Sequence, residues 1–293
     1  MVEPFKILVP IGFSDQSLMA LDQAVVFAKA AGDSEITLLT VIEEEGFLKK
    51  LFSSSQDADS LRENVSDKIK GVAKEYQEKH GLQFKTMVAK GLVYEEIARV
   101  CEMLESNLVV MGTNGKPQNL RRRFIGSNAY RTATLVHPPV VTVKGVRHPG
   151  KIDTIIFPLV LDRRSKEKVG TTLEFARLFD ANIKVVSVVQ ADDEAKKLRA
   201  HLKQVENFIN DHGVKCSSEL LTPTEHKGLV RNTLEYAYKN DGDLIVVTEE
   251  DRERDMTDYF LGNDVQSVIY HSEIPVMSIT PSRVKWEAMW ESF

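Results

Sequence analysis

Cysteine is scarce in this sequence: its 293 residues include only Cys101 and Cys216. The two cysteines lie in different halves of the chain and match neither a metal-binding nor a redox spacing. The seven histidines also fail to gather with cysteines or carboxylates at the spacing of metal ligands. We therefore expect no metal site, and the low cysteine content is typical of a protein kept in a reducing cytoplasm.

The sequence has neither a basic excess nor a long apolar run. Its formal net charge is -5, whereas sequence-independent binding to nucleic acid needs a basic surface. No apolar run approaches the roughly 20 residues that cross a bilayer, and residues 1–6 lack the apolar stretch of a signal peptide. These features predict a cytoplasmic protein that binds neither nucleic acid nor a membrane.

The common motifs of nucleotide and acyl chemistry are also missing. There is no P-loop pattern, no Gly-x-Gly-x-x-Gly after the first expected strand, and no Gly-x-Ser-x-Gly around Ser14 or Ser127. The Ser-Gly-Gly-x-Asp-Ser loop of ATP pyrophosphatases and the His-x-Gly-His step of nucleotidyl transferases are absent too. We therefore expect no catalytic residues and no enzyme, with slow ATP hydrolysis as an open alternative.

The sequence does contain one pattern of strands and helices that occurs twice. Amphipathic helices alternate with short apolar strands, and the strands are expected near 7–11, 36–41, 84–89, 108–111 and 139–143, then near 154–159, 183–188, 215–221, 244–247 and 275–279. This alternation predicts the α/β class, as two tandem open parallel five-stranded sheets with helices on both faces. We predict two domains, 1–146 and 151–282, and a C-terminal tail, 283–293.

Candidate binding residues lie directly after the fourth strand of the first half. Gly112 and Gly115 leave the strand, and Gly126 and Ser127 open a helix. In open α/β sheets, ligands collect beyond the carboxyl ends of the strands. Glycines let backbone amides approach a phosphate, and a helix N-terminus offers unpaired N–H groups. The same residues equally suit a tight turn and a helix cap, so the spacing leaves both interpretations open.

Around this segment the sequence resembles the universal stress protein family. That family has Gly-x-x-Gly, nine residues and Gly-Ser/Thr after its fourth strand, and the likeness includes Ile-Leu-Val-Pro at 7–10 and Pro-Pro-Val-Val-Thr-Val at 138–143. The likeness extends more faintly over the second half, which indicates a tandem member with a fold like that of the adenine-nucleotide alpha hydrolases. It implies a stress-related regulatory protein that binds ATP or AMP, with magnesium only alongside ATP.

The resemblance also implies which residues would bind the nucleotide. The phosphate and ribose contacts would come from Gly112, Asn114, Gly115, Gly126, Ser127 and Asn128. The adenine contacts would come from Pro10, Ile11, Gly12 and the backbone of Val41.

Two departures from the family pattern bear on affinity. Gly12 stands where the family's nucleotide binders have an aspartate, and ten residues, 116–125, separate Gly115 from Gly126. A surface loop tolerates one extra residue. Losing a charge-assisted hydrogen bond costs about 1.5–3 kcal/mol, or about 10- to 150-fold in affinity. Weak binding and no binding both stay open, and without binding the protein would be a nucleotide-independent interaction scaffold.

The second half lacks the glycine signature. Its fourth strand is followed at 249–255 by Glu-Glu-Asp-Arg-Glu-Arg-Asp, and acidic side chains repel phosphates. We expect this half to be structural or to bind an unidentified protein partner. The resemblance further implies that the fifth strands, 140–143 and 276–279, pair as a pseudo-dimer within the chain, because each would otherwise leave an open sheet edge. Further homo-oligomers stay open.

Overall fold

The computed structural model describes residues 3–43, 55–113, 128–144, 150–159, 165–189, 195–222, 229–248 and 262–279. The chain divides into two compact units, Met1–His148 and Pro149–Phe293. The tail expected at 283–293 lies outside the described residues.

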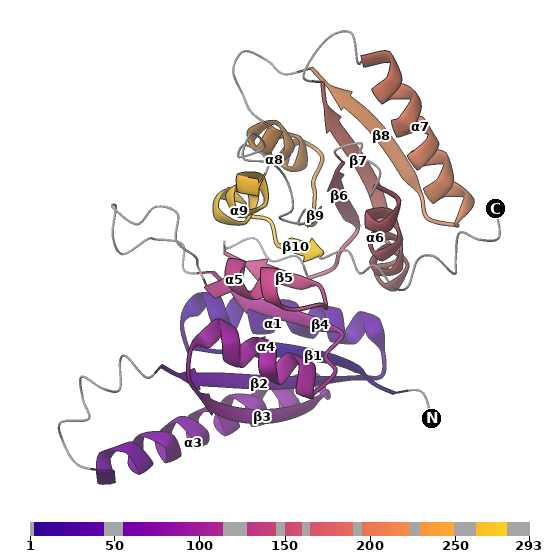
Figure 1. Ribbon diagram of the computed structural model, residues 1–293. Helices are drawn as coiled ribbons and strands as arrows, with labels where there is room; N and C mark the ends of the chain where they lie inside the picture. The colour runs from indigo at the N-terminus through magenta and orange to yellow at the C-terminus, as the bar shows by residue number, and fades with distance from the viewer. Residues whose placement is uncertain are drawn as a thin grey trace. The chain divides into compact units, whose positions relative to one another are not determined.

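The first unit is an open parallel sheet with helices on both faces (Figure 1). In chain order its elements are β1 (Phe5–Pro10), α1 (Asp15–Ala31), β2 (Ser34–Ile42), α3 (Ser55–His80), β3 (Gln83–Lys90), α4 (Val93–Met103), β4 (Leu108–Gly112), α5 (Asn128–Leu135) and β5 (Val140–Val143). The strand order is β3-β2-β1-β4-β5, and the paired strands all run parallel. The predicted fold class is thereby confirmed for this half.

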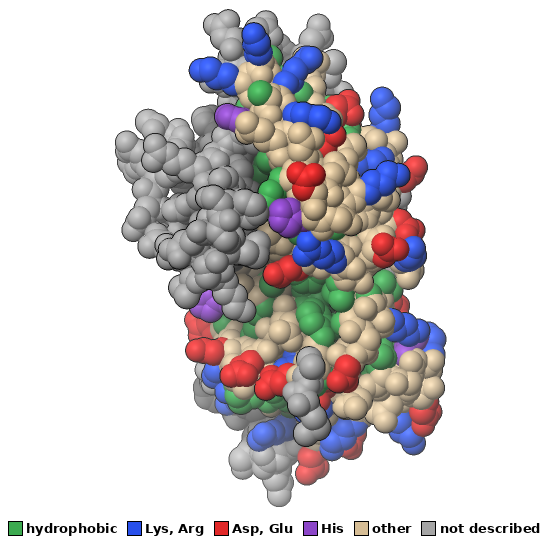
Figure 2. All heavy atoms as spheres, turned by 90° about the vertical axis from the view of Figure 1, so that its right-hand side faces the viewer, with side chains coloured by type: hydrophobic (Ala, Val, Ile, Leu, Met, Phe, Trp, Pro, Cys, Tyr) green, Lys and Arg blue, Asp and Glu red, His purple; other side chains and the backbone are tan. Residues whose placement is uncertain are grey.

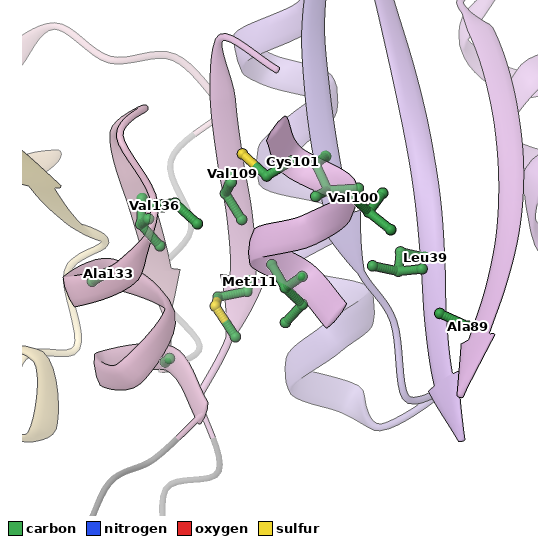
Figure 3. Close-up of a cluster of buried hydrophobic side chains, with 12 residues drawn as sticks. Leu39, Ala89, Val100, Cys101, Val109, Met111, Ala133 and Val136 are labelled. Atoms are coloured by element: carbon green, nitrogen blue, oxygen red, sulfur yellow. The ribbon is translucent and has the colours of Figure 1, made fainter. Parts of the chain in front are cut away.

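Apolar side chains fill the space between the sheet and the helices α4 and α5. Figure 3 shows Val100 and Cys101 of α4 and Ala133 of α5 beside Val109 and Met111 of β4, all in one buried cluster. Because successive side chains of a strand point to opposite faces, a strand covered on both sides has to be apolar throughout. The four buried residues 108–111 of β4 meet this condition.

The opposite face of the sheet is covered by α1 and α3. Ala20, Leu21 and Phe27 of α1 are completely buried, and the Tyr76 hydroxyl of α3 donates a hydrogen bond to Asp22 of α1 over 2.8 Å. The side chain of Ser14 accepts a hydrogen bond from the Ser17 backbone N–H and so caps the start of α1. The two helices are therefore bonded to each other as well as packed on the sheet.

The second unit repeats this plan. Its elements are β6 (Thr154–Pro158), α6 (Ser165–Phe179), β7 (Asn182–Val188), α7 (Ala195–Asp211), β8 (Cys216–Leu221), α8 (Leu229–Lys239), β9 (Leu244–Thr248), α9 (Gly262–His271) and β10 (Val276–Ile279). Its strand order is β8-β7-β6-β9-β10, again parallel. The predicted fold class is confirmed here too.

Acidic and basic side chains are interspersed on the face drawn in Figure 2. This mixture agrees with the nearly balanced charge of the sequence, which has 38 basic and 43 acidic residues. Among the helices that the structure describes, none is long and apolar enough to cross a membrane.

Candidate functional site

The strand order of the first unit reverses between β1 and β4. From β1 the chain builds β2 and β3 on one side and then returns to place β4 and β5 on the other. Both strands end at the same edge of the sheet, called here the carboxyl edge, with Pro10 closing β1 and Gly112 closing β4. Such a reversal is the usual ligand position in an open α/β sheet, because the loops diverge there and leave a crevice.

Hydrogen bonds hold the backbone where β1 leaves the sheet. The Ile11 N–H donates to the Leu39 carbonyl over 2.8 Å, and the Thr40 hydroxyl donates to the Ile11 carbonyl over 3.0 Å. Ile11 itself is buried. The next residue, Gly12, is exposed, and a Cβ built on it would meet no heavy atom within 4 Å. Hydrogen bonds therefore fix the backbone as far as Ile11, and open space surrounds Gly12. The turn formed by residues 11–13 is called here the corner at Gly12.

Phe13 completes this corner in an unusual conformation. Its φ of 60° lies in the left-handed region, which bulky residues rarely adopt. The other described non-glycine residues with positive φ, Glu105, Asp180 and Asp241, come just after helix ends, where this conformation is common. The Lys68 ammonium of α3 lies 4.3 Å from the centroid of the Phe13 ring, a cation–π contact that ties α3 to the corner.

At the end of β4, Gly112 lies directly against the first turn of α1. A Cβ at this position would lie 2.6 Å from the carbonyl carbon and oxygen of Gln16 and 2.8 Å from the Ser17 nitrogen. These are backbone atoms, so no side-chain rotation could make room. The fold therefore requires glycine at 112 for packing, whether or not a phosphate also approaches there.

Thr113, which sequence reasoning did not single out, follows Gly112 and is only 6% exposed. Its backbone N–H donates to the Val143 carbonyl over 2.9 Å, so the β4–β5 ladder continues through this residue. Its hydroxyl oxygen is buried and has no hydrogen-bond partner among the described residues. The available signal in the sequence was a lone hydroxyl at the end of an apolar strand.

The structure places six of the ten predicted binding residues. Those at strand ends on the carboxyl edge, or at the start of α5, are Pro10, Ile11, Gly12, Val41, Gly112 and Asn128. Val41 is partly buried against the α4–α5 core cluster, and Asn128 is exposed. The other four, Asn114, Gly115, Gly126 and Ser127, lie outside the described residues.

Comparison with known proteins gives the family. The family model described as "Universal stress protein family" matches residues 5–144. Universal stress protein MJ0531 of Methanocaldococcus jannaschii is 33% identical over 141 residues, which are 47% of this chain and 81% of the relative. The chain belongs to the universal stress protein family. Universal stress protein MJ0577 of the same organism is 28% identical over 155 residues, covering 47% of this chain and 94% of the relative.

A solved universal stress protein from Archaeoglobus fulgidus has the same fold over nearly the entire length. It superimposes with a TM-score of 0.75 at 18% identity and covers 95% of this chain and 97% of its own. At that identity the likeness concerns the fold alone. The universal stress protein fold therefore extends across both units, although the family model matches only residues 5–144.

Proposed function

We propose that the first unit binds an adenine nucleotide, ATP or AMP, and that this ligand controls a stress-related regulatory function. Membership in the universal stress protein family supports the ligand class. The observation that carries the proposal is the open corner at Gly12, beside the reversal of strand order between β1 and β4. The adenine would lie at this corner, against Pro10 and Ile11 and within reach of the Val41 backbone.

The phosphates would lie on the β4 side of the same edge. Helix α5 begins at Asn128, so its unpaired N–H groups and the positive end of its dipole favour an anion. The phosphate and ribose contacts proposed from the sequence are Gly112, Asn114, Gly115, Gly126, Ser127 and Asn128. Magnesium would accompany ATP alone, since a divalent cation typically bridges neighbouring phosphates.

The second unit is proposed to be structural or to bind a protein partner. The sequence after Thr248 is strongly acidic and has no glycine until Gly262, so it would repel the phosphates that the first unit attracts. The nucleotide would then act as a ligand that shapes the first unit, and no catalytic step is assigned to either unit.

The competing proposal is a scaffold that binds no nucleotide. Two observations favour it: Gly12 carries no carboxylate, and packing against α1 already accounts for the glycine at 112. In that case Gly112 would serve only the packing of α1 against β4.

Calorimetric titration separates the two proposals. The purified full chain is titrated with ATP plus magnesium, ATP without magnesium, and AMP. The Gly126→Asp variant, which puts a negative charge in the proposed phosphate site, is expected to lose binding. Gly71→Asp is the matched control, because Gly71 lies in α3 with open space around it. Micromolar binding lost only in Gly126→Asp supports the nucleotide proposal, whereas no heat from the folded wild type supports the scaffold.

A further inference from the structure

The turn between β1 and α1 holds Phe13 in a strained conformation between two fixed points. Before it, Ile11 is buried, and its carbonyl accepts a hydrogen bond from the Thr40 hydroxyl over 3.0 Å. After it, the side chain of Ser14 caps the start of α1. A φ of 60° at Phe13 costs free energy because the residue is bulky. Such strain persists only where the surrounding structure maintains it, and it is frequent at ligand sites.

Lys68 of α3 contacts the strained residue from outside the turn. Its ammonium lies 4.3 Å from the centroid of the Phe13 ring, which is the distance of a cation–π interaction. The next residue of the helix, Ile69, is completely buried, so this part of α3 is fixed by packing. Lys68 itself is exposed, so its side chain is not part of the core. The contact therefore joins a fixed helix to the corner at Gly12.

We propose that Lys68 is a positioning residue for the nucleotide: it holds Phe13 in the left-handed conformation and so keeps the corner at Gly12 open for the adenine. This inference rests on the proposed function and adds a residue that does not touch the ligand. Gly12 directly precedes Phe13, so the φ of Phe13 sets the orientation of the peptide group between them. When the turn relaxes, fewer molecules present the open corner, and the apparent affinity falls in proportion to that fraction.

Lys68→Met tests this role, because methionine keeps an apolar side chain and removes the charge over the Phe13 ring. In calorimetric titrations of the full chain, the variant is expected to bind ATP and adenosine about two- to fivefold more weakly. This fold-change corresponds to one exposed cation–π contact. The two losses should be equal because both ligands carry adenine. A lysine that instead attracted the phosphates would, when replaced, weaken the binding of ATP and leave that of adenosine unchanged.

Three further variants control for charge and for the ring. Lys74→Met removes another exposed lysine of α3, one that pairs with Glu78, and should leave both affinities unchanged. Lys68→Arg keeps a cation over the ring and should bind both ligands like the wild type. Phe13→Gly has no ring and adopts a positive φ without strain. Adding Lys68→Met to Phe13→Gly should therefore have no further effect on either affinity.

The outcomes separate this inference from the proposed function. A wild type that binds neither ATP nor adenosine overturns both. A wild type that binds the two ligands and a Lys68→Met that binds them equally well overturn the role of Lys68 alone. A loss confined to ATP, or an equal loss from Lys68→Met in the Phe13→Gly background, would show that Lys68 does not act through Phe13 and would also overturn its positioning role.

Discussion

At the residue scale, two glycines of the first unit are glycine for different reasons. A Cβ at Gly112 would meet the backbone of Gln16 at 2.6 Å, whereas one at Gly12 would meet nothing within 4 Å. The first glycine is therefore demanded by the packing of α1 on β4. The second is free to change, since its φ also lies outside the left-handed region.

Gly112→Ala is expected to destabilise the protein by about 1–3 kcal/mol, the usual cost of overpacking a close contact. The free energy of unfolding is measured by urea titration. Gly71→Ala is the control: Gly71 lies in α3 with open space around it, and the same substitution there should stabilise by roughly 0.5–1 kcal/mol. Equal effects of the two substitutions would contradict the contact with Gln16.

Gly12→Asp is expected to strengthen nucleotide binding by about 10- to 150-fold, the equivalent of one good charge-assisted hydrogen bond. The substitution fits because the corner is open at this position, and it restores the carboxylate that the family resemblance places there. Calorimetric titration with ATP measures the affinity. Gly12→Asn is the control, because it adds a side chain of the same size without the charge. An aspartate variant that binds ATP no better than the asparagine variant would contradict this prediction.

At the scale of elements, α1 and α3 meet through a small polar cluster between their helix faces. Tyr76 is buried, and its hydroxyl donates a hydrogen bond to Asp22. The centroid of its ring lies 5.5 Å from the centroid of the His80 ring. Burial, followed by the hydrogen bond to Asp22, raises the pKa of Tyr76. Burial is also the largest cause that lowers the pKa of His80, and Lys29 of α1 is the next.

The pKa of His80 in the folded protein is therefore expected below 6.5, measured by NMR titration of the ring. A histidine with a lowered folded-state pKa binds its proton more readily when unfolded. The stability that neutral His80 contributes is thus present above pH 6.5 and is lost as the pH falls from 6.5 through the folded-state pKa.

Lys29→Met should raise the pKa of His80, because it removes the nearby positive charge on α1. Lys74→Met, an exposed lysine on α3 that pairs with Glu78, should leave it unchanged. A wild-type His80 pKa at or above 6.5 would show that burial and Lys29 do not control its protonation.

At the scale of the whole molecule, each unit has one buried cysteine. Burial raises the pKa of Cys101 to about 11 and that of Cys216 to about 12. Because the thiolate is the reactive form, neither thiol should react appreciably near neutral pH while its unit is folded. The two cysteines can therefore serve as separate reporters of the two units.

A chromogenic disulfide reagent at pH 8 is expected to modify the native protein many times more slowly than the urea-unfolded protein. Cys101→Ser and Cys216→Ser leave one reporter each, so the rate of each thiol against urea concentration follows the unfolding of one unit. Rapid modification of either thiol in native protein would contradict its burial.

The pairing of the fifth strands, 140–143 with 276–279, stays a prediction.

The sequence predicted those parts of the fold that depend on the pattern of neighbouring residues along the chain. The alternation of apolar strands and amphipathic helices predicted the strands of both units closely, for example 108–111 against β4 at Leu108–Gly112. Helix α3 begins at Ser55, and residues 55–60, Ser-Gln-Asp-Ala-Asp-Ser, show no apolar period, so the residue pattern alone does not mark where this helix starts.

The sequence by itself determined the repeated α/β architecture, the family and the position of the glycine segment, because these depend on residue type and spacing along the chain. Only the tertiary structure decided that Gly112 is pressed against Gln16, that Gly12 faces open space, and that the Thr113 hydroxyl is buried without a partner among the described residues. Each depends on atoms brought together from distant segments, and no spacing along the chain encodes such distances.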